Sequence, residues 1–123
     1  MRKSTIFVII VSVLFVITSA QAKEWYEGGT LHQATIKEWR TADNADKVAT
    51  CADFIAWSYQ KGLLILPLSD AESMRPYVIE LVTCIDTFAE GTDDDDNVRE
   101  FANVNPIADI ASMGMIIMGW TKK

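Results

Sequence analysis

Apolar residues recur at three- and four-residue steps through much of the chain after residue 30, which predicts amphipathic helices. One such stripe consists of Val48, Cys51, Ala52, Ile55 and Tyr59. A second consists of Met74, Val78, Leu81, Val82, Ile85 and Phe88. Asp43 or Asn44 is expected to open the first of these helices, and Gly62 suits the position just after its end, where a positive φ is needed.

Two short motifs predict where helices begin. Thr30-Leu31-His32-Gln33 and Ser69-Asp70-Ala71-Glu72 both match a capping box, in which side chains satisfy free N–H groups of the first turn. The first motif predicts a helix from about Leu31 to Arg40. The second predicts a helix that continues to Gly91, with a kink or a restart at Pro76. The apolar run 63–67 between the predicted helices has no evident partner strand, and we expect a buried connector.

The C-terminal part predicts two further helical pieces, divided by Pro106. They cover 97–104 and 107–120, and the second has a face of small and apolar residues: Ile107, Ile110, Ala111, Gly114, Ile117 and Met118. Asp109 interrupts this stretch, which disfavours a membrane span. The expected fold is therefore all-α, a small single-domain bundle of four to five short helices.

The N-terminal segment has the order of a secretory signal peptide. A positive start at Met1–Lys3 precedes an apolar run at Ile6–Ile17, and small residues stand at Ala20 and Ala22 before a cut. The apolar run is shorter than the roughly 20 residues that a membrane anchor needs. We therefore expect residues 1–22 to be removed, leaving one helical domain, 23–123, in the periplasm or outside the cell.

Export changes the interpretation of Cys51 and Cys84, the two cysteines of the chain. An even number of cysteines in an oxidising compartment favours a disulfide. Each cysteine falls on the apolar stripe of its predicted helix, so one bridge would join the two helices. Two buried free thiols are the alternative. A redox enzyme is disfavoured because there is no Cys-x-x-Cys pair.

Charge and composition exclude several classes of protein. Eleven basic and 17 acidic residues give a formal net charge of −6, which argues against a nucleic-acid binder. One histidine and two cysteines are too few for a structural zinc site. The acidic run 93–96 fails as an EF-hand loop, because Val98 and Val104 stand where glycine and glutamate are required. We expect a solvated acidic turn there, and no metal or cofactor.

The sequence offers no catalytic set. His32 is the single histidine, and no serine or cysteine nucleophile pattern surrounds it. Asp53 lies beside the first apolar stripe, and a carboxylate on the surface of a helix is its simpler interpretation. We therefore expect a binding protein rather than an enzyme.

Four tryptophans, Trp25, Trp39, Trp57 and Trp120, are many for a chain of this size. Aromatic residues serve either the core or an interface. Core packing is the simpler interpretation for most of them. Trp25 and Tyr26 precede the first predicted helix, which makes them the candidates for contact with a protein partner.

The segment 50–55, Thr-Cys-Ala-Asp-Phe-Ile, resembles the first-cysteine motif of the HdeA-type periplasmic acid-stress chaperones. The resemblance implies a small helical protein with one disulfide, in which Cys84 takes the partner role. It also implies that acid loosens the fold and exposes apolar surface to unfolded clients. The closer cysteines and the more apolar C-terminal half depart from that family.

The alternative is a constitutively folded inhibitor or immunity-type protein that binds one cell-envelope partner. The sequence does not determine the oligomeric state.

Overall fold

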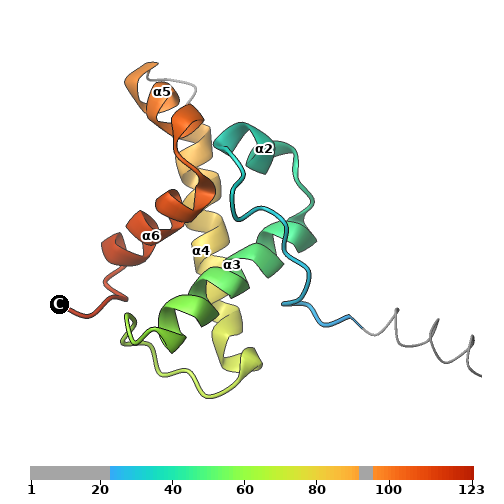
Figure 1. The fold of residues 1–123 in the computed structure, drawn as a ribbon, viewed down its shortest axis with the longest axis vertical. Helices are drawn as coiled ribbons and strands as arrows, with labels where there is room; N and C mark the ends of the chain where they lie inside the picture. Colours follow the sequence, from blue (N-terminus) through green and yellow to red (C-terminus); the bar gives the residue numbers. More distant parts are fainter. Residues whose placement is uncertain (1–22, 92–95) are drawn as a thin grey trace, which may run out of the picture.

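The computed structural model describes residues 23–91 and 96–123, and this part of the chain is all-α (Figure 1). Its five helices are α2 (Ile36–Thr41), α3 (Asn44–Gln60), α4 (Ala71–Gly91), α5 (Asp96–Val104) and α6 (Ile107–Ile117). The expected helical bundle is confirmed for the described residues. The predicted signal peptide, 1–22, lies outside them.

The long helix α4 is the centre of the bundle. α3 and α6 pack against it, and α2 contacts both α4 and α5. The fully buried side chains come from every part of this arrangement and include Trp39, Ile55, Leu81, Ile85 and Ile107. Helices in proteins gain most of their stability from such packing, and the short helices α2, α5 and α6 would be marginal alone in water.

Both predicted capping boxes are wrong in position. α2 begins after Thr35, whose hydroxyl accepts from the Glu38 N–H while the Glu38 side chain returns to the Thr35 N–H. Thr30 lies outside the helix because its hydroxyl is bound elsewhere, to Asp46. At α4 the first turn is closed by Asp70, which accepts from the Ser73 N–H at 2.8 Å.

The predicted extents of α3 and α4 are confirmed. Asp43 is the N-cap residue of α3, and Gly62 follows the helix with φ 75°. α4 ends at Gly91, and Pro76 lies inside it without ending the helix. These two helices are the ones with the longest regular apolar stripes, so their local pattern and their tertiary packing agree.

The segment 63–67 is a connector, as expected, and it is paired with the C-terminal residues. Leu64 forms a single antiparallel bridge with Thr121. The Ile65 N–H donates to the Trp120 carbonyl at 2.8 Å, and the Lys122 N–H donates to the Leu63 carbonyl at 2.9 Å. Leu64 and Leu66 are buried, whereas Leu63 and Ile65 are exposed, so the connector is only half buried.

α6 ends three residues earlier than the sequence predicts. Gly119 turns the chain with φ 75°, so that Trp120 can pack in the core and pair with the connector. The helix buries Met115, and Ile117, expected on the packing face, is 78% exposed.

The expected Cys51–Cys84 disulfide is wrong, because the two cysteines are free and are not near each other. Cys51 is buried in the core, but Cys84 lies at the edge of the α4 stripe, one residue from the fully buried Ile85. Its Sγ faces Gly114 of α6, 3.0 Å from the place where a Cβ would be. Burial raises the pKa of both thiols, so both are protonated at neutral pH and are poor nucleophiles.

Candidate functional site

The segment 28–34 lies directly on helix α3. Gly28 has φ +83°, a backbone conformation that side chains strongly disfavour. At Gly29 a Cβ would lie 2.5 Å from the backbone nitrogen of Thr50, which is closer than atoms can approach. Glycine is therefore required at both positions for the loop to reach the helix.

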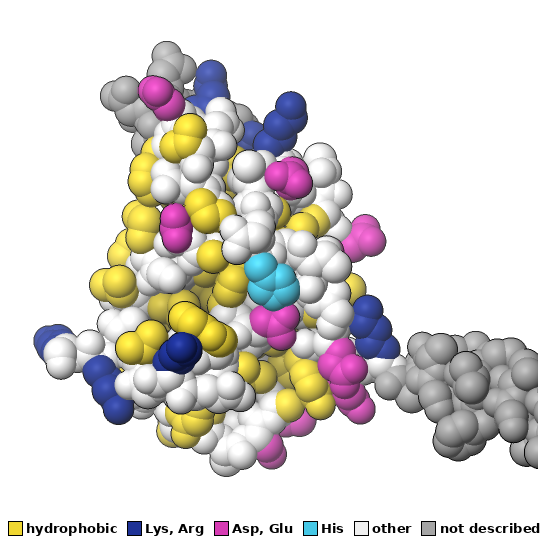
Figure 2. Space-filling model, viewed as in Figure 1, with side chains coloured by type: hydrophobic (Ala, Val, Ile, Leu, Met, Phe, Trp, Pro, Cys, Tyr) yellow, Lys and Arg dark blue, Asp and Glu magenta, His cyan; other side chains and the backbone are white. Residues whose placement is uncertain are grey.

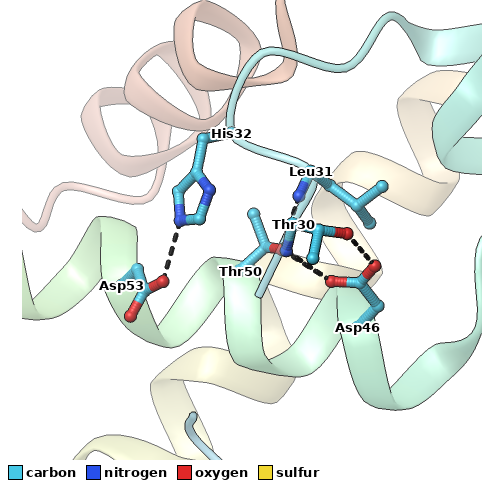
Figure 3. Close-up of polar contacts among 6 residues, drawn as sticks. All are labelled: Thr30, Leu31, His32, Asp46, Thr50 and Asp53. Carbon is cyan, nitrogen blue, oxygen red and sulfur yellow. Dashed lines mark hydrogen bonds and ion pairs between the residues drawn. The ribbon is translucent and has the colours of Figure 1, made fainter. Parts of the chain in front are cut away.

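A cluster of polar groups fastens this segment to α3 (Figure 3). The Thr30 N–H donates to Asp46 Oδ1 at 2.7 Å, and the Thr30 hydroxyl donates to the other oxygen of the same carboxylate. The Thr50 hydroxyl donates to Asp46 at 3.3 Å and accepts from the Leu31 N–H at 3.2 Å. Asp46 and Thr50, one turn apart on α3, thus satisfy two backbone N–H groups of the loop.

These contacts change the titration of Asp46. Partial burial acts to raise its pKa, but the hydrogen bonds from Thr30 and Thr50 and the nearby His32 outweigh it, so the pKa lies below its ordinary value of 3.8. The carboxylate is therefore ionised at neutral pH, which is the state that accepts these hydrogen bonds.

His32 and Asp53, two residues that the sequence gives no reason to pair, meet at the next turn of α3. His32 Nε2 lies 2.8 Å from Asp53 Oδ2 (Figure 3). The imidazole also stands edge-on against the Phe54 ring, with centroids 5.6 Å apart. Just beyond, the Ala34 carbonyl accepts from the Ile107 N–H at 2.7 Å. The segment therefore spans from α3 to the start of α6 and places His32 between them.

A groove of about 600 Å³ opens beside this histidine, between α3 and α6. Figure 2 shows the hollow next to the histidine, with hydrophobic side chains inside it. Its lining combines apolar and polar side chains and consists of His32, Gln33, Asp53, Phe54, Ala56, Trp57, Ser58, Gln60, Ala108, Ser112 and Met115. Such a mixture of apolar surface and a few polar groups is typical of binding sites.

The polar groups of the groove are partly exposed or already hydrogen-bonded. The side chains of His32 and Asp53 are 39% and 47% exposed, so both can also bond to a ligand. The Ser112 hydroxyl donates to the Ala108 carbonyl of its own helix at 3.0 Å. A nucleophile needs a base within hydrogen-bond reach, and the His32 contact that the structure shows is with Asp53. That the chain is not an enzyme stays a prediction.

The tryptophans divide between the core and the surface. Trp39 and Trp120 are buried. Trp25 and Tyr26, the expected partner contacts, are half-buried, and Trp25 donates to Glu72 at 2.9 Å. Trp57 is 58% exposed at the groove. Sequence reasoning missed it as a candidate, although its position two residues after the buried Ile55 places it on the opposite side of the helix.

Two other kinds of site were sought in the described part of the chain. Within 23–91 and 96–123, no three His, Cys, Asp or Glu side chains gather closely enough to bind a metal ion. No helix among these residues has both the length and the apolar content needed to cross a bilayer. The acidic run 93–96 lies almost wholly outside the described residues, so the expectation of a solvated turn there is untested.

Comparison with known proteins found no matching family model, no matching curated protein and no matching solved structure. The resemblance of residues 50–55 to the HdeA-type chaperones is therefore untested. In this fold the motif belongs to α3, where Thr50 and Asp53 hold the segment 28–34 and Cys51 packs in the core.

Proposed function

We propose that this chain is an exported, non-enzymatic binding protein, and that the groove between α3 and α6 holds an apolar segment of one protein partner. The observation that carries the proposal is Trp57, which is 58% exposed beside an open, largely apolar groove in the folded chain. Tryptophan is among the residues that most often dominate binding energies, because it buries a large area at low entropic cost.

A polar group of the groove favours a partner that supplies hydrogen-bond donors. Asp53 is half exposed and carries an acceptor oxygen beyond the one that contacts His32. A backbone N–H, a lysine or an arginine of the partner would pair with it. Because the groove exists without any unfolding, these features favour the constitutively folded inhibitor or immunity-type protein.

The test places a photo-crosslinking amino acid in the groove, in place of Ser112, and expresses the variant in the cells that make the protein. Ser112 is exposed and lines the groove. The matched control replaces Thr83, which is exposed on α4 and does not line the groove. We expect position 112 to crosslink one protein. We expect position 83 not to crosslink that protein.

The crosslinked protein is then purified and titrated against the wild-type chain and against Ala108→Phe, which fills the groove. We expect Ala108→Phe to weaken binding about tenfold or more, since a misfit in a hot spot costs 2 kcal/mol or more. Thr83→Phe should leave it unchanged. Equal crosslinking from both positions, or equal affinity of all three chains, contradicts the proposal.

A second function, acid-stress chaperoning, is favoured by the Asp46 cluster. Protonation of Asp46 at low pH would take away the charge and one of the two oxygens that accept from Thr30, and the segment 28–34 carries the buried Leu31 and Ala34. Release of the segment would expose apolar surface to unfolded clients. The test follows the light scattering of an aggregating protein at pH about 2.5, below the ordinary carboxyl pKa values. Suppression by the wild-type chain supports this function. No suppression, with the helical signal intact, ends it.

A further inference from the structure

Three lysines gather at one end of the described part of the molecule. Lys61 follows α3, and Lys122 and Lys123 follow α6, both of which run toward the side where the C-terminus lies (Figure 1). Among the residues that the structure describes, none of the three forms an ion pair with an acidic side chain. Figure 2 shows basic and hydrophobic groups together at the lower left of the molecule, with no acidic group among them.

Exposed aliphatic side chains occupy the same end. The Lys122 N–H donates to the Leu63 carbonyl and the Ile65 N–H donates to the Trp120 carbonyl, so these segments are side by side. Leu63 and Ile65 are exposed on the connector, and Ile117 is exposed at the last turn of α6. Lys61 also lies over the exposed ring of Trp57, 5.0 Å from its centroid. We call the set Lys61, Leu63, Ile65, Ile117, Lys122 and Lys123 the lysine end.

We propose that the lysine end binds the surface of a membrane that carries anionic lipid headgroups, with the chain lying on the bilayer rather than crossing it. Exposed aliphatic side chains enter the headgroup region, while lysines beside them pair with anionic lipids. The whole chain has a net charge of −6, so an anionic surface repels most of the molecule and attracts this end. Charge thus fixes the orientation as well as the contact.

The composition of the lysine end distinguishes a membrane from a protein partner. Lysine is depleted in protein–protein interfaces, whereas lysine, aliphatic residues and tryptophan together are typical of segments that lie at a bilayer surface. A second copy of the chain would bring three further lysines against these three, and like charges repel. In this orientation the groove stays open beside the bilayer. Trp57 then lies where the groove meets the lysine end.

The test uses the chain from Lys23 to Lys123, because every buried core residue in the described part of the chain lies between Leu31 and Trp120. Circular dichroism first establishes that each variant has the wild-type helical signal. Binding is then measured by flotation with vesicles of phosphatidylcholine alone, or of phosphatidylcholine with about a third phosphatidylglycerol. We expect binding to the anionic vesicles only, and a loss of binding at high salt, which screens the lysines.

Matched variants separate the lysine end from the rest of the surface. Lys61→Gln with Lys122→Gln should weaken binding about tenfold or more, since each lysine near an anionic surface contributes about fivefold. Lys23→Gln with Lys37→Gln makes the same change of charge elsewhere and should leave binding unchanged. Ile65→Gln with Ile117→Gln should also weaken it. The control for that pair, Ile79→Gln with Val104→Gln, has similar exposure: 53% and 74%, against 60% and 78%.

Three results would overturn the proposal. The wild-type chain could fail to float with anionic vesicles. Each control double variant could weaken binding as much as the lysine-end double variant that it matches, which would indicate adsorption without a defined surface. Sedimentation could show a dimer that dissociates in the Ile65→Gln and Ile117→Gln variant, which would assign this end to a second copy of the chain.

Discussion

The two ends of helix α3 differ in what their side chains contact. At the N-terminal end, Asp46, Thr50 and Asp53 bond to successive residues of the segment 28–34. At the C-terminal end, Trp57 and Lys61 are exposed, and the Lys61 ammonium lies over the Trp57 ring. One end of the helix therefore holds the protein's own chain, and the other presents groups that a partner can use.

The difference shows how a small helical domain keeps a surface available for binding. Contiguous exposed apolar groups are unusual on a monomer and mark interaction sites. Here the opposite end of the same helix is anchored by backbone and carboxylate hydrogen bonds. Changes at the anchored end should therefore alter stability, and changes at the open end should alter binding. The predictions below test this division, starting with the largest expected effect on stability.

Gly29→Ala should have the largest effect. Its methyl group would overlap the backbone of Thr50, so the segment 28–34 must lift from α3. We expect a loss of about 3 kcal/mol of folding free energy, the upper range for overpacking. Thermal unfolding followed by circular dichroism measures it. The control is Gly91→Ala, where nothing lies within 4 Å of the new methyl group and stability should not fall. Equal melting temperatures for both variants would contradict the close contact at Gly29.

Asp46→Asn should have an intermediate effect that depends on pH. The amide is a weaker acceptor than the carboxylate, so we expect a loss of about 1 kcal/mol at pH 7. Because the folded pKa lies below 3.8, the carboxylate contributes its stability above the unfolded pKa and loses it as pH falls through the folded value. Urea unfolding at pH 7 and at about pH 2.5 measures both chains. A difference between them that does not become smaller at the lower pH argues against Asp46 as the titrating group.

His32→Gln should cost less, about 0.5 to 1 kcal/mol, because its contact with Asp53 is partly exposed and solvent screens it. Asp53→Asn should cost a similar amount, and the double variant should lose less than the sum of the two. Urea unfolding of the three variants gives this coupling. Strict additivity would show that the contact does not hold the segment to α3.

Trp57→Gln should have the smallest effect on stability, within about 0.5 kcal/mol of the wild type, as is usual for exposed positions. Binding of the groove partner should fall by about 2 kcal/mol or more. Calorimetric titration and thermal unfolding of the same preparation measure the two quantities. A large loss of stability with unchanged affinity would reverse the roles assigned to the two ends of α3.

The sequence predicted the long helices well because their pattern is local. The stripe that contains Ile55 and the glycine at Gly62 define α3, and the stripe that contains Leu81 and Ile85 defines most of α4. The capping boxes failed because Thr30 and Thr35 both fit the motif, and only tertiary contact selects between them. Gly29 brings Thr30 within reach of Asp46, which removes its hydroxyl from the role of a cap.

The candidate site was harder to predict than the fold. His32 and Asp53 are 21 residues apart, and no periodic pattern links a loop residue to a particular turn of a helix. The disulfide was inferred from the apolar stripes of two helices. Such a stripe is too wide to show which neighbouring helix a side chain faces: Cys84 shares a stripe with Ile85 but faces α6 instead of α3. The exposure of Trp57 could have been inferred from its angle on the helix, because it lies opposite the buried Ile55.

The hydrogen bond from Ile107 to Ala34 has a consequence for the order of folding. α3 and α4 follow one another closely in the chain and form the largest helix contact, so they can associate early. The Ala34–Ile107 bond closes a far longer loop, and its entropic cost is met only when α6 docks. The segment 28–34 therefore makes its contact with α6, at Ala34, only at that stage. The groove beside His32 is therefore complete only at the end of folding, and the amide proton of Ile107 reports that moment in a pulsed exchange experiment.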